Sequence, residues 1–390
     1  MPWRATWPMD QRMQFIAAWL REEEAMSLLC RRYGVSRKTG YKWVARYEAG
    51  GAPALVDRSH APHHQPAAVS IGTQRAILGL RAKHPQWGPR KLRAWLAQRG
   101  DGAWPAPSTI GALLQRAGLT VSRPRRARRG GTGSPAVVAD ANDVWAADFK
   151  GWFRTGDGRR CDPLTISDLH SRYLLRCQVV GATQMELVQP IFEAAFREYG
   201  LPRAMRTDNG APFAGARGLS RLAVWWIRLG VRPERIAPGH PEQNAVHERM
   251  HRTLKEATAT PPQATLAAQQ RAFDRFRRVY NDERPHEALG QRPPVMAYMA
   301  SPRPYPERLP RIEYPEPFTV RRAHPNGDIK WHGRRVLISQ ALAGQPVGLE
   351  AVADGAWRVW FGAVELGWLD ARRPERMHPI PKRLLPISSD

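Results

Sequence analysis

The first fifty residues place apolar side chains at helical spacing. Residues 8–50 therefore predict a run of helices. The first helix carries an apolar stripe, made of Met13, Ile16, Ala17 and Leu20. The second and third helices have four expected buried positions: Leu29, Tyr33, Val35 and Trp43. Gly34 permits a tight turn between these two helices, and Ser36 stands where a side chain caps the third.

Two helices joined through a glycine turn resemble a helix-turn-helix, which we place at residues 1–55. Cys30 is the small residue expected where the two helices touch. The third helix would present four side chains to a DNA groove: Arg37, Lys38, Tyr41 and Lys42. An ordinary helical hairpin is the alternative. The coincidence of the turn glycine, the cap and the basic outer face favours DNA binding.

The next segments alternate between linkers and a second helical unit. Residues 56–70 are rich in Pro, His and Ala and are typical of a linker. Residues 71–120 predict a unit of winged or helix-turn-helix type, with Ser108 capping its last helix and Gly118 ending it. A purely structural spacer is the alternative. Residues 121–142 form a basic linker whose arginines would follow DNA phosphates: Arg125, Arg126, Arg128 and Arg129.

From residue 143 the pattern changes to strands. Residues 144–153, 163–167 and 173–180 predict three antiparallel strands, with a hairpin turn at Thr155–Gly158. An amphipathic helix, a short strand at 204–208 and two further helices follow. This order predicts a mixed sheet with helices packed on it, so residues 143–300 form an α/β domain.

The last part of the chain predicts an all-β domain. Residues 301–317 form a Pro-rich linker. Five short β segments and two Gly-containing hairpin signals between 318 and 385 predict a small barrel of SH3-like type. Most of its tryptophans are expected in the core, namely Trp331, Trp357, Trp360 and Trp368. Phosphate contacts are expected from Arg321, Arg322, Arg334 and Arg335.

The charge of the chain narrows the class of partner. Lys and Arg number 60 against 35 Asp and Glu, which gives a formal net charge of +25. A polyanion, most simply double-stranded DNA, is the expected partner, with a ribosome-like or membrane-surface role as the alternative. No segment is apolar enough to be a secretion signal or a membrane span. The three cysteines form no C-x-x-C pair, so we expect a reducing cytoplasm and no disulfide framework.

Three acidic residues stand out by their surroundings. Asp148 lies within an apolar strand, where a carboxylate is costly unless it is paired or bound to a metal. Asp208 ends a strand beside a sharp turn, and Glu248 lies early in a helix. Carboxylates from two strands and a helix can converge on one point. Such a set of oxygen ligands suits Mg²⁺ or Mn²⁺.

The segments around these acids resemble a known family. The three motifs are Trp145–Gly151, Thr207–Phe213 and Gly239–Lys255. In order and type they are similar to the signatures of the integrase core of bacterial insertion-sequence transposases and retroviral integrases. Tyr280–Leu289 resembles the segment that closes this core in the insertion-sequence branch. The chain departs from the family at Ala245-Val246, where Gly-Arg is common, and in a slightly longer interval before Glu248.

The resemblance implies a ribonuclease H-like fold and a DDE triad of Asp148, Asp208 and Glu248. It implies two Mg²⁺ or Mn²⁺ ions per active site, which support DNA 3′-end cleavage and strand transfer of a mobile element. Lys255 lies two helical turns after Glu248 and would hold a phosphate, and His251 and Arg252 are further candidate DNA contacts. Asp168 is expected to form a turn. The implied partners are element-end and target DNA, bound by a homodimer or a higher multimer in the bacterial nucleoid.

Two other functions stay open at this point. One is a domesticated DNA-binding regulator with an inactive core. The other is a recombinase that uses a Ser or Tyr nucleophile and forms a covalent link to DNA. The intact acids at 148, 208 and 248 favour the metal-dependent transposase over both.

Overall fold

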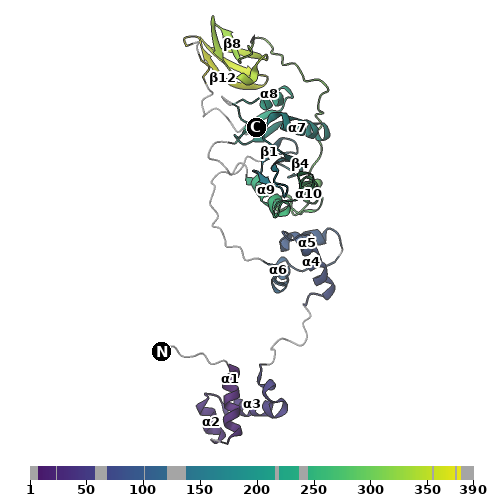
Figure 1. Ribbon diagram of the computed structural model, residues 1–390, viewed down its shortest axis with the longest axis vertical. Coiled ribbons are helices and arrows are strands. Elements are labelled where there is room, and N and C mark those ends of the chain that lie inside the picture. Colours follow the sequence, from purple (N-terminus) through teal and green to yellow (C-terminus); the bar gives the residue numbers. More distant parts are fainter. Residues whose placement is uncertain are drawn as a thin grey trace. The chain divides into compact units, whose positions relative to one another are not determined.

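The computed structural model describes residues 8–22, 24–57, 68–100, 102–120, 138–215, 219–236, 245–353, 355–373 and 376–378 (Figure 1). The chain divides into two compact units, Met1–Val69 and Ser70–Asp390. The basic-linker arginines predicted to follow DNA lie outside the described residues, namely Arg125, Arg126, Arg128 and Arg129. No helix among the described residues is long and apolar enough to cross a membrane.

The first unit is a three-helix bundle made of α1 (Pro8–Leu20), α2 (Met26–Arg32) and α3 (Arg37–Gly50). Ser36 caps α3 as predicted, because its hydroxyl oxygen accepts a hydrogen bond from the Thr39 amide at 3.2 Å. The turn glycine, Gly34, has a φ of 64°, a left-handed conformation that favours glycine. The apolar stripe predicted for α1 is wrong in part. Met13 and Leu20 are exposed, and the buried side chains of α1 are Phe15, Ile16 and Ala18.

The second helical unit consists of α4 (Ile71–Lys83), α5 (Pro89–Ala97) and α6 (Pro107–Arg116). These helices bury a shared apolar core of Ile77, Leu80, Trp87, Leu92, Leu96, Ile110, Leu113 and Leu114. The predicted cap of the last helix is wrong. The helix begins one residue earlier, at Pro107, so Ser108 lies inside its first turn and no side chain caps it. Gly118 follows its end with a φ of 67°, as expected for a helix stop.

The α/β region predicted at residues 143–300 is built on one mixed sheet. Its strands are β1 (Val144–Phe149), β2 (Phe153–Arg154), β3 (Arg160–Asp168), β4 (Leu174–Val180), β5 (Ala204–Thr207) and β6 (Arg232–Arg235). They pair in the order β2-β3-β1-β5-β6, and β4 pairs with β3. The pairs β1–β5 and β5–β6 are parallel, and the pairs that involve β3 are antiparallel. The predicted mixed sheet is confirmed, while β6 is a strand that the sequence pattern did not indicate.

Helices cover both faces of this sheet. They are α7 (Met185–Tyr199), α8 (Arg221–Arg228), α9 (Ala245–Thr258) and α10 (Leu266–Arg278). The aromatic faces of α7 and α8 pack on one side, where Trp145 and Met205 of the sheet are fully buried. On the other side, α9 and α10 pack against β3 and β4 through Met250, Leu254 and Phe273. The core is therefore a three-layer α/β/α arrangement, with α9 and α10 together on one face (Figure 1).

The Pro-rich segment 301–317 packs along the core rather than acting as a free linker. Ser301 donates its hydroxyl to the Leu201 carbonyl at 2.7 Å. Arg303 donates to the carbonyl oxygens of Pro202 at 2.8 Å and Gly230 at 2.9 Å. Further on, the Tyr314 hydroxyl donates to the Trp360 carbonyl at 3.1 Å. Backbone hydrogen bonds add to these contacts, from the Ser301 amide to the Tyr199 carbonyl at 2.8 Å and from the Leu201 amide to the Arg303 carbonyl at 2.7 Å.

The C-terminal region is all-β, as predicted, with strands β7 (Thr319–Arg322), β8 (Asp328–Trp331), β9 (Arg334–Leu337), β10 (Pro346–Ala353), β11 (Ala356–Phe361) and β12 (Val364–Asp370). Its described strands form a four-stranded sheet and a two-stranded sheet and do not close into a barrel. The prediction that most tryptophans lie in its core is wrong. Only Trp331 is buried, and the core is mainly aliphatic, with Ile329, Val336, Val347, Leu349, Val359 and Leu369 fully buried.

Candidate active site

Asp148 and Asp208 come together through the register of two parallel strands. Strand β1 pairs with β5 so that Ala147 lies opposite Thr207. The next residue in each segment is an aspartate, Asp148 within β1 and Asp208 just after β5, so the two acids follow paired positions of adjacent parallel strands. Neighbouring strands lie about 4.8 Å apart. The register therefore brings the backbones of the two acids to the same end of the sheet.

Alternation along the strands sets which layer these acids face. Trp145 and Ala147 point into the core beneath α7 and α8. Val144 and Ala146 point to the opposite face, where Val246 of α9 packs against them. Asp148 continues the second set because side chains alternate along a strand. The carboxylate is therefore directed to the layer that holds α9.

Asp208 is held in place at a turn. One of its carboxylate oxygens, Oδ1, accepts a hydrogen bond from the Gly210 amide at 3.1 Å. The neighbouring Asn209 donates its side-chain amide to the Ile236 carbonyl at 3.0 Å, just after β6. The Asp208 side chain is half-buried. The turn therefore fixes the backbone of Asp208 while its carboxylate stays partly accessible to solvent.

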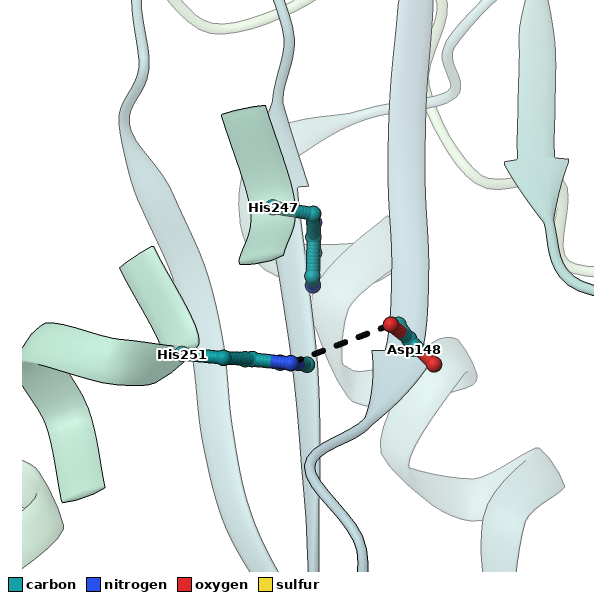
Figure 2. A group of neighbouring side chains, drawn as sticks. All are labelled: Asp148, His247 and His251. Atoms are coloured by element: carbon teal, nitrogen blue, oxygen red, sulfur yellow. Dashed lines mark ion pairs between the residues drawn. The ribbon is translucent and has the colours of Figure 1, made fainter. Parts of the chain in front are cut away.

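Two histidines of α9 face Asp148 on this side of the sheet (Figure 2). Nδ1 of His251 lies 3.8 Å from Oδ2 of Asp148. His247, one helical turn earlier, stands beside it with the two ring planes nearly perpendicular and the ring centroids 4.6 Å apart. A ring nitrogen of each histidine and a carboxylate oxygen of Asp148 all lie within 4.8 Å of one another. Among the described residues this is the one such group of three His, Cys, Asp or Glu side chains.

Thr165 of β3 holds the two imidazoles in place. Its hydroxyl oxygen lies 2.6 Å from Nε2 of His247 and 2.6 Å from Nε2 of His251. Nδ1 of His247 also lies 3.2 Å from the Ser167 hydroxyl. Thr165 is fully buried, so these contacts satisfy polar atoms that water does not reach. Both ring nitrogens of His247 and Nε2 of His251 therefore contact hydroxyls of β3.

Both imidazoles are neutral at physiological pH. Burial lowers the pKa of His247 from 6.5 to about 3. Burial also lowers the pKa of His251, and the neighbouring His247 and Lys150 lower it further. Removal from water disfavours the charged form of an imidazole. The pair therefore offers neutral nitrogen lone pairs rather than positive charge to the site.

Glu248, the third predicted acid, lies on α9 between these histidines but is exposed. It follows His247 by one residue, which is about 100° around the helix axis. The described residues therefore bring Asp148 and Asp208 to one sheet edge. They do not bring Glu248 into a group with them, since the three-residue cluster at this point contains His247 and His251 instead.

The other predicted site residues fall into two groups. The first group is exposed, as expected for DNA contacts. It consists of Arg37, Lys38, Tyr41 and Lys42 on α3 and of Arg252 and Lys255 on α9. His251 differs from its predicted role. Its side chain is only 4% exposed and is directed at Asp148 and Thr165, so this placement does not support a DNA contact. Asp168 is buried and accepts hydrogen bonds from Asn142 and Ser171, in keeping with the turn-forming role expected for it.

The residue that the sequence reasoning missed is His247. The signal was present, because His247 and His251 are four residues apart and share one face of a helix. The direction of that face was not readable from the helix alone. It depends on the contact with Thr165, which lies 82 residues before His247.

Comparisons with known proteins agree with this fold and organisation. Two models of an integrase core domain match residues 139–241 and 229–294. A helix-turn-helix domain matches residues 11–63, and a homeodomain-like domain matches residues 39–114. The C-terminal domain of the IS481 transposase family matches residues 318–376.

Individual relatives come from insertion elements. A 39.2 kDa uncharacterized protein of insertion element IS476 from Xanthomonas euvesicatoria is 30% identical over 240 residues, which cover 60% of this chain and 66% of that protein. The transposase InsD of the IS2 elements of Escherichia coli is 29% identical over 294 residues, or 70% of this chain and 93% of InsD. The HTLV-2 integrase catalytic core domain, solved in complex with magnesium, aligns with 41% of this chain and 98% of its own at 13% identity and a TM-score of 0.33.

The family matches and the relatives define the class of this protein. The chain belongs to the insertion-sequence transposases of the retroviral integrase-like superfamily. Its helix-turn-helix unit, integrase core and all-β C-terminal region follow one another in the order that the sequence predicted.

Proposed function

We propose that this transposase cleaves the 3′ ends of its element and joins them to target DNA by metal-dependent phosphoryl transfer. The observation that carries this proposal is the β1–β5 register, which sets Asp148 beside Asp208 at the carboxyl ends of two parallel strands. Paired carboxylates at a sheet edge are suited to hold a cation against a phosphate. Bound divalent ions would supply Lewis-acid stabilisation of the transferred phosphoryl group and activation of water or a DNA 3′-hydroxyl.

The residues fit Mg²⁺ or Mn²⁺ on the sheet side of the site. Asp148 and Asp208 offer oxygen ligands, which both ions prefer, and their half-buried positions leave room for water and phosphate. Glu248 is the third ligand in this proposal, and two ions per site are implied by the family. Glu248 is exposed on α9. To reach the two aspartates, its side chain or α9 must change position when DNA and metal bind.

The basic surfaces would hold the DNA. We assign base and phosphate contacts at element ends to Arg37, Lys38, Tyr41 and Lys42 of α3, whose exposed face follows a capped helix start. Arg252 and Lys255 share the exposed side of α9 with Glu248, so they would bind phosphates next to the reacting bond. The predicted basic linker at 121–142 and the exposed arginines of β7 and β9 would add phosphate contacts.

A transposase acts on two ends at once, so we propose a homodimer or a higher multimer assembled on DNA in the bacterial nucleoid. We propose the domain boundaries that the sequence predicts: residues 1–55, 71–120, 143–300 and 318–385. The second helical unit contacts the core in this structure, since Gln98 donates to the Gln291 carbonyl at 2.9 Å and Arg90 pairs with Glu287 at 3.2 Å.

The test is strand transfer with purified wild-type and variant proteins, a duplex carrying the element's terminal repeats, and a target plasmid. We expect joining with Mg²⁺ or Mn²⁺ and none with EDTA. Asp148→Asn, Asp208→Asn and Glu248→Gln should each reduce joining by more than about 100-fold, because each ligand supports several kcal/mol of charge stabilisation. The exposed Glu186→Gln on α7 is the matched control and should join DNA normally.

Three results would separate this proposal from the alternatives. Joining that persists in all three acid variants would overturn the assignment of the site. A covalent protein–DNA adduct formed in EDTA would indicate a Ser or Tyr nucleophile. Specific binding of the terminal repeats without cleavage by the wild-type protein would favour a regulator with an inactive core.

A further inference from the structure

The contact between Asp148 and His251 has the geometry of two ligands of one metal ion. The 3.8 Å between Nδ1 of His251 and Oδ2 of Asp148 is too long for a hydrogen bond. Two ligand atoms of a tetrahedral Zn²⁺ with bonds of 2.0–2.1 Å lie about 3.3–3.4 Å apart. A movement of about half an ångström would bring this pair to the spacing of metal ligands.

Hydrogen bonds orient the correct nitrogen of His251. Thr165 donates its only hydroxyl proton to the Asp148 carbonyl at 3.1 Å. At 2.6 Å it then accepts a proton from Nε2 of His251. This tautomer leaves a lone pair on Nδ1, the nitrogen that faces the Asp148 carboxylate. Two acceptors that face each other create a position for a cation.

His247 completes a three-ligand set. The Ser167 hydroxyl lies 3.2 Å from Nδ1 of His247 and can accept the proton of that nitrogen. Nε2 of His247 lies 2.6 Å from the Thr165 hydroxyl, and a bound ion would take the place of that contact. Each imidazole then has one nitrogen toward the ion and the other held by a hydroxyl of β3. Metal-binding histidines are usually held in this way by a second group. One ring nitrogen of each histidine and a carboxylate oxygen of Asp148 already lie within 4.8 Å of one another.

We propose that Asp148, His247 and His251 form a binding site for a transition-metal ion such as Zn²⁺ or Co²⁺, distinct from the magnesium-type site at Asp148 and Asp208. Two imidazole nitrogens select such ions over Mg²⁺, which prefers oxygen ligands. Three protein ligands leave a fourth position for water, as in zinc sites that are not purely structural. His247 is fully buried and His251 nearly so, which excludes bulk water from two of the three ligands.

The two sites share Asp148 and therefore exclude each other. A Zn²⁺ ion held by α9 would draw Asp148 away from Asp208 and keep α9 in the orientation that leaves Glu248 exposed. Zn²⁺ would then inhibit Mg²⁺-supported strand transfer by competition. The predicted inhibition by Zn²⁺ rests on the function proposed above, whereas the binding of the ion does not.

The binding test uses full-length protein and Co²⁺ as a spectroscopic substitute for Zn²⁺. Three other histidines, His60, His63 and His64, lie close in sequence and are replaced by Asn in the background so that they do not compete for the ion. We expect one Co²⁺ per chain with the visible absorption of a four-coordinate site, displaced by Zn²⁺ but not by Mg²⁺. His251→Gln and His247→Gln should each weaken Zn²⁺ binding by more than about 100-fold, since outer-shell changes alone cost 10–100-fold.

The exposed His332→Asn is the matched control and should leave Co²⁺ binding unchanged. Asparagine also suits the positive φ of 45° at this position. Circular dichroism and denaturant unfolding establish that the histidine variants are folded. Equal Zn²⁺ affinity in the wild type and both histidine variants would overturn the site. So would a Co²⁺ spectrum typical of six oxygen ligands.

Activity then tests the competition separately. Zn²⁺ should inhibit joining by the wild type, and its inhibition should weaken at least about tenfold in His247→Gln, relative to that variant's own rate without Zn²⁺. If the wild type joins no DNA while the Co²⁺ site is present, only the proposed function fails. If joining is normal and the Co²⁺ site is absent, only this inference fails.

Discussion

The first helical unit and the catalytic core differ in how far along the chain their key contacts reach. In the first unit, the Ser36 hydroxyl accepts from the Thr39 amide, three residues later, and Gly40 packs against Cys30, ten residues earlier. In the core, Thr165 contacts histidines 82 and 86 residues later. A change in the first unit should therefore act on one helix contact. A change in a core strand should act on the sheet and on α9 together.

The largest effect is expected for Trp145→Ala in β1. Trp145 is fully buried beneath α7, and its indole nitrogen donates to Asn142 at 3.0 Å. Its loss should lower the free energy of unfolding of the core by about 3–5 kcal/mol. Denaturant unfolding measures this change. Trp152→Ala is the control, because Trp152 is 57% exposed and its loss should cost less than about 0.5 kcal/mol. Equal costs for the two variants would contradict the buried role of Trp145.

A smaller effect is expected for Thr165→Val, which keeps the shape of the side chain and removes its hydroxyl. Both histidine Nε2 atoms then lose a partner in a buried environment, and the core should lose about 1–3 kcal/mol. Hydrogen exchange should increase in α9 while the first unit stays unchanged. Thr319→Val, the same isosteric change on half-buried β7, should be neutral within about 0.5 kcal/mol. Unaltered exchange in α9 would show that Thr165 does not hold this helix.

Gly40→Ala tests the local packing of the first unit. A Cβ at Gly40 would lie 2.5 Å from Sγ of Cys30 and 3.1 Å from the Phe15 ring, so α2 and α3 must separate. We expect a loss of about 1–3 kcal/mol from overpacking, confined to the unfolding of the first unit. Gly79→Ala in α4 is the matched control. A Cβ there meets nothing within 4 Å, so the substitution should stabilise its helix by about 0.5–1 kcal/mol. Stabilisation by both substitutions would rule out the tight contact at Gly40.

The smallest effect is expected at the cap of α3. Ser36→Ala removes the acceptor for the Thr39 amide and should cost about 1 kcal/mol. Ser36→Thr keeps that acceptor and should retain most of the stability. Thermal unfolding of the first unit compares the two. A Thr variant as unstable as the Ala variant would mean that the hydroxyl does not cap the helix.

The same difference in range explains what the sequence could predict. The cap at Ser36, the glycine turn at Gly34 and the strands around Asp148 depend on neighbouring residues, and all three were predicted correctly. The direction of α9 depends on Thr165 and Ser167 of β3, so the burial of His247 and His251 was not predictable from their own helix. Strand β6 is short and polar, and only its parallel pairing with β5 defines it.

The C-terminal region shows a second limit of pattern reading. Alternation located five of its six strands but did not indicate which face of each strand would be covered. The structure leaves three of the tryptophans only half-buried, namely Trp357, Trp360 and Trp368. Trp360 donates its indole N–H to Glu350 at 3.0 Å. The proline-rich segment before it was expected to be a linker. Ser301 and Arg303 reach backbone carbonyls of the core, and Tyr314 reaches the Trp360 carbonyl of the C-terminal region. Composition does not report such contacts.

The central claim is that Asp148 and Asp208 hold the same divalent ion for strand transfer. Anomalous diffraction from crystals of the wild-type protein with Mn²⁺ tests it most directly, because the signal locates the ion without reference to activity. The account predicts an anomalous peak within ligand distance of both carboxylates at the ends of β1 and β5. A peak that contacts only one of these aspartates, or Mn²⁺ bound elsewhere with neither as a ligand, would contradict it.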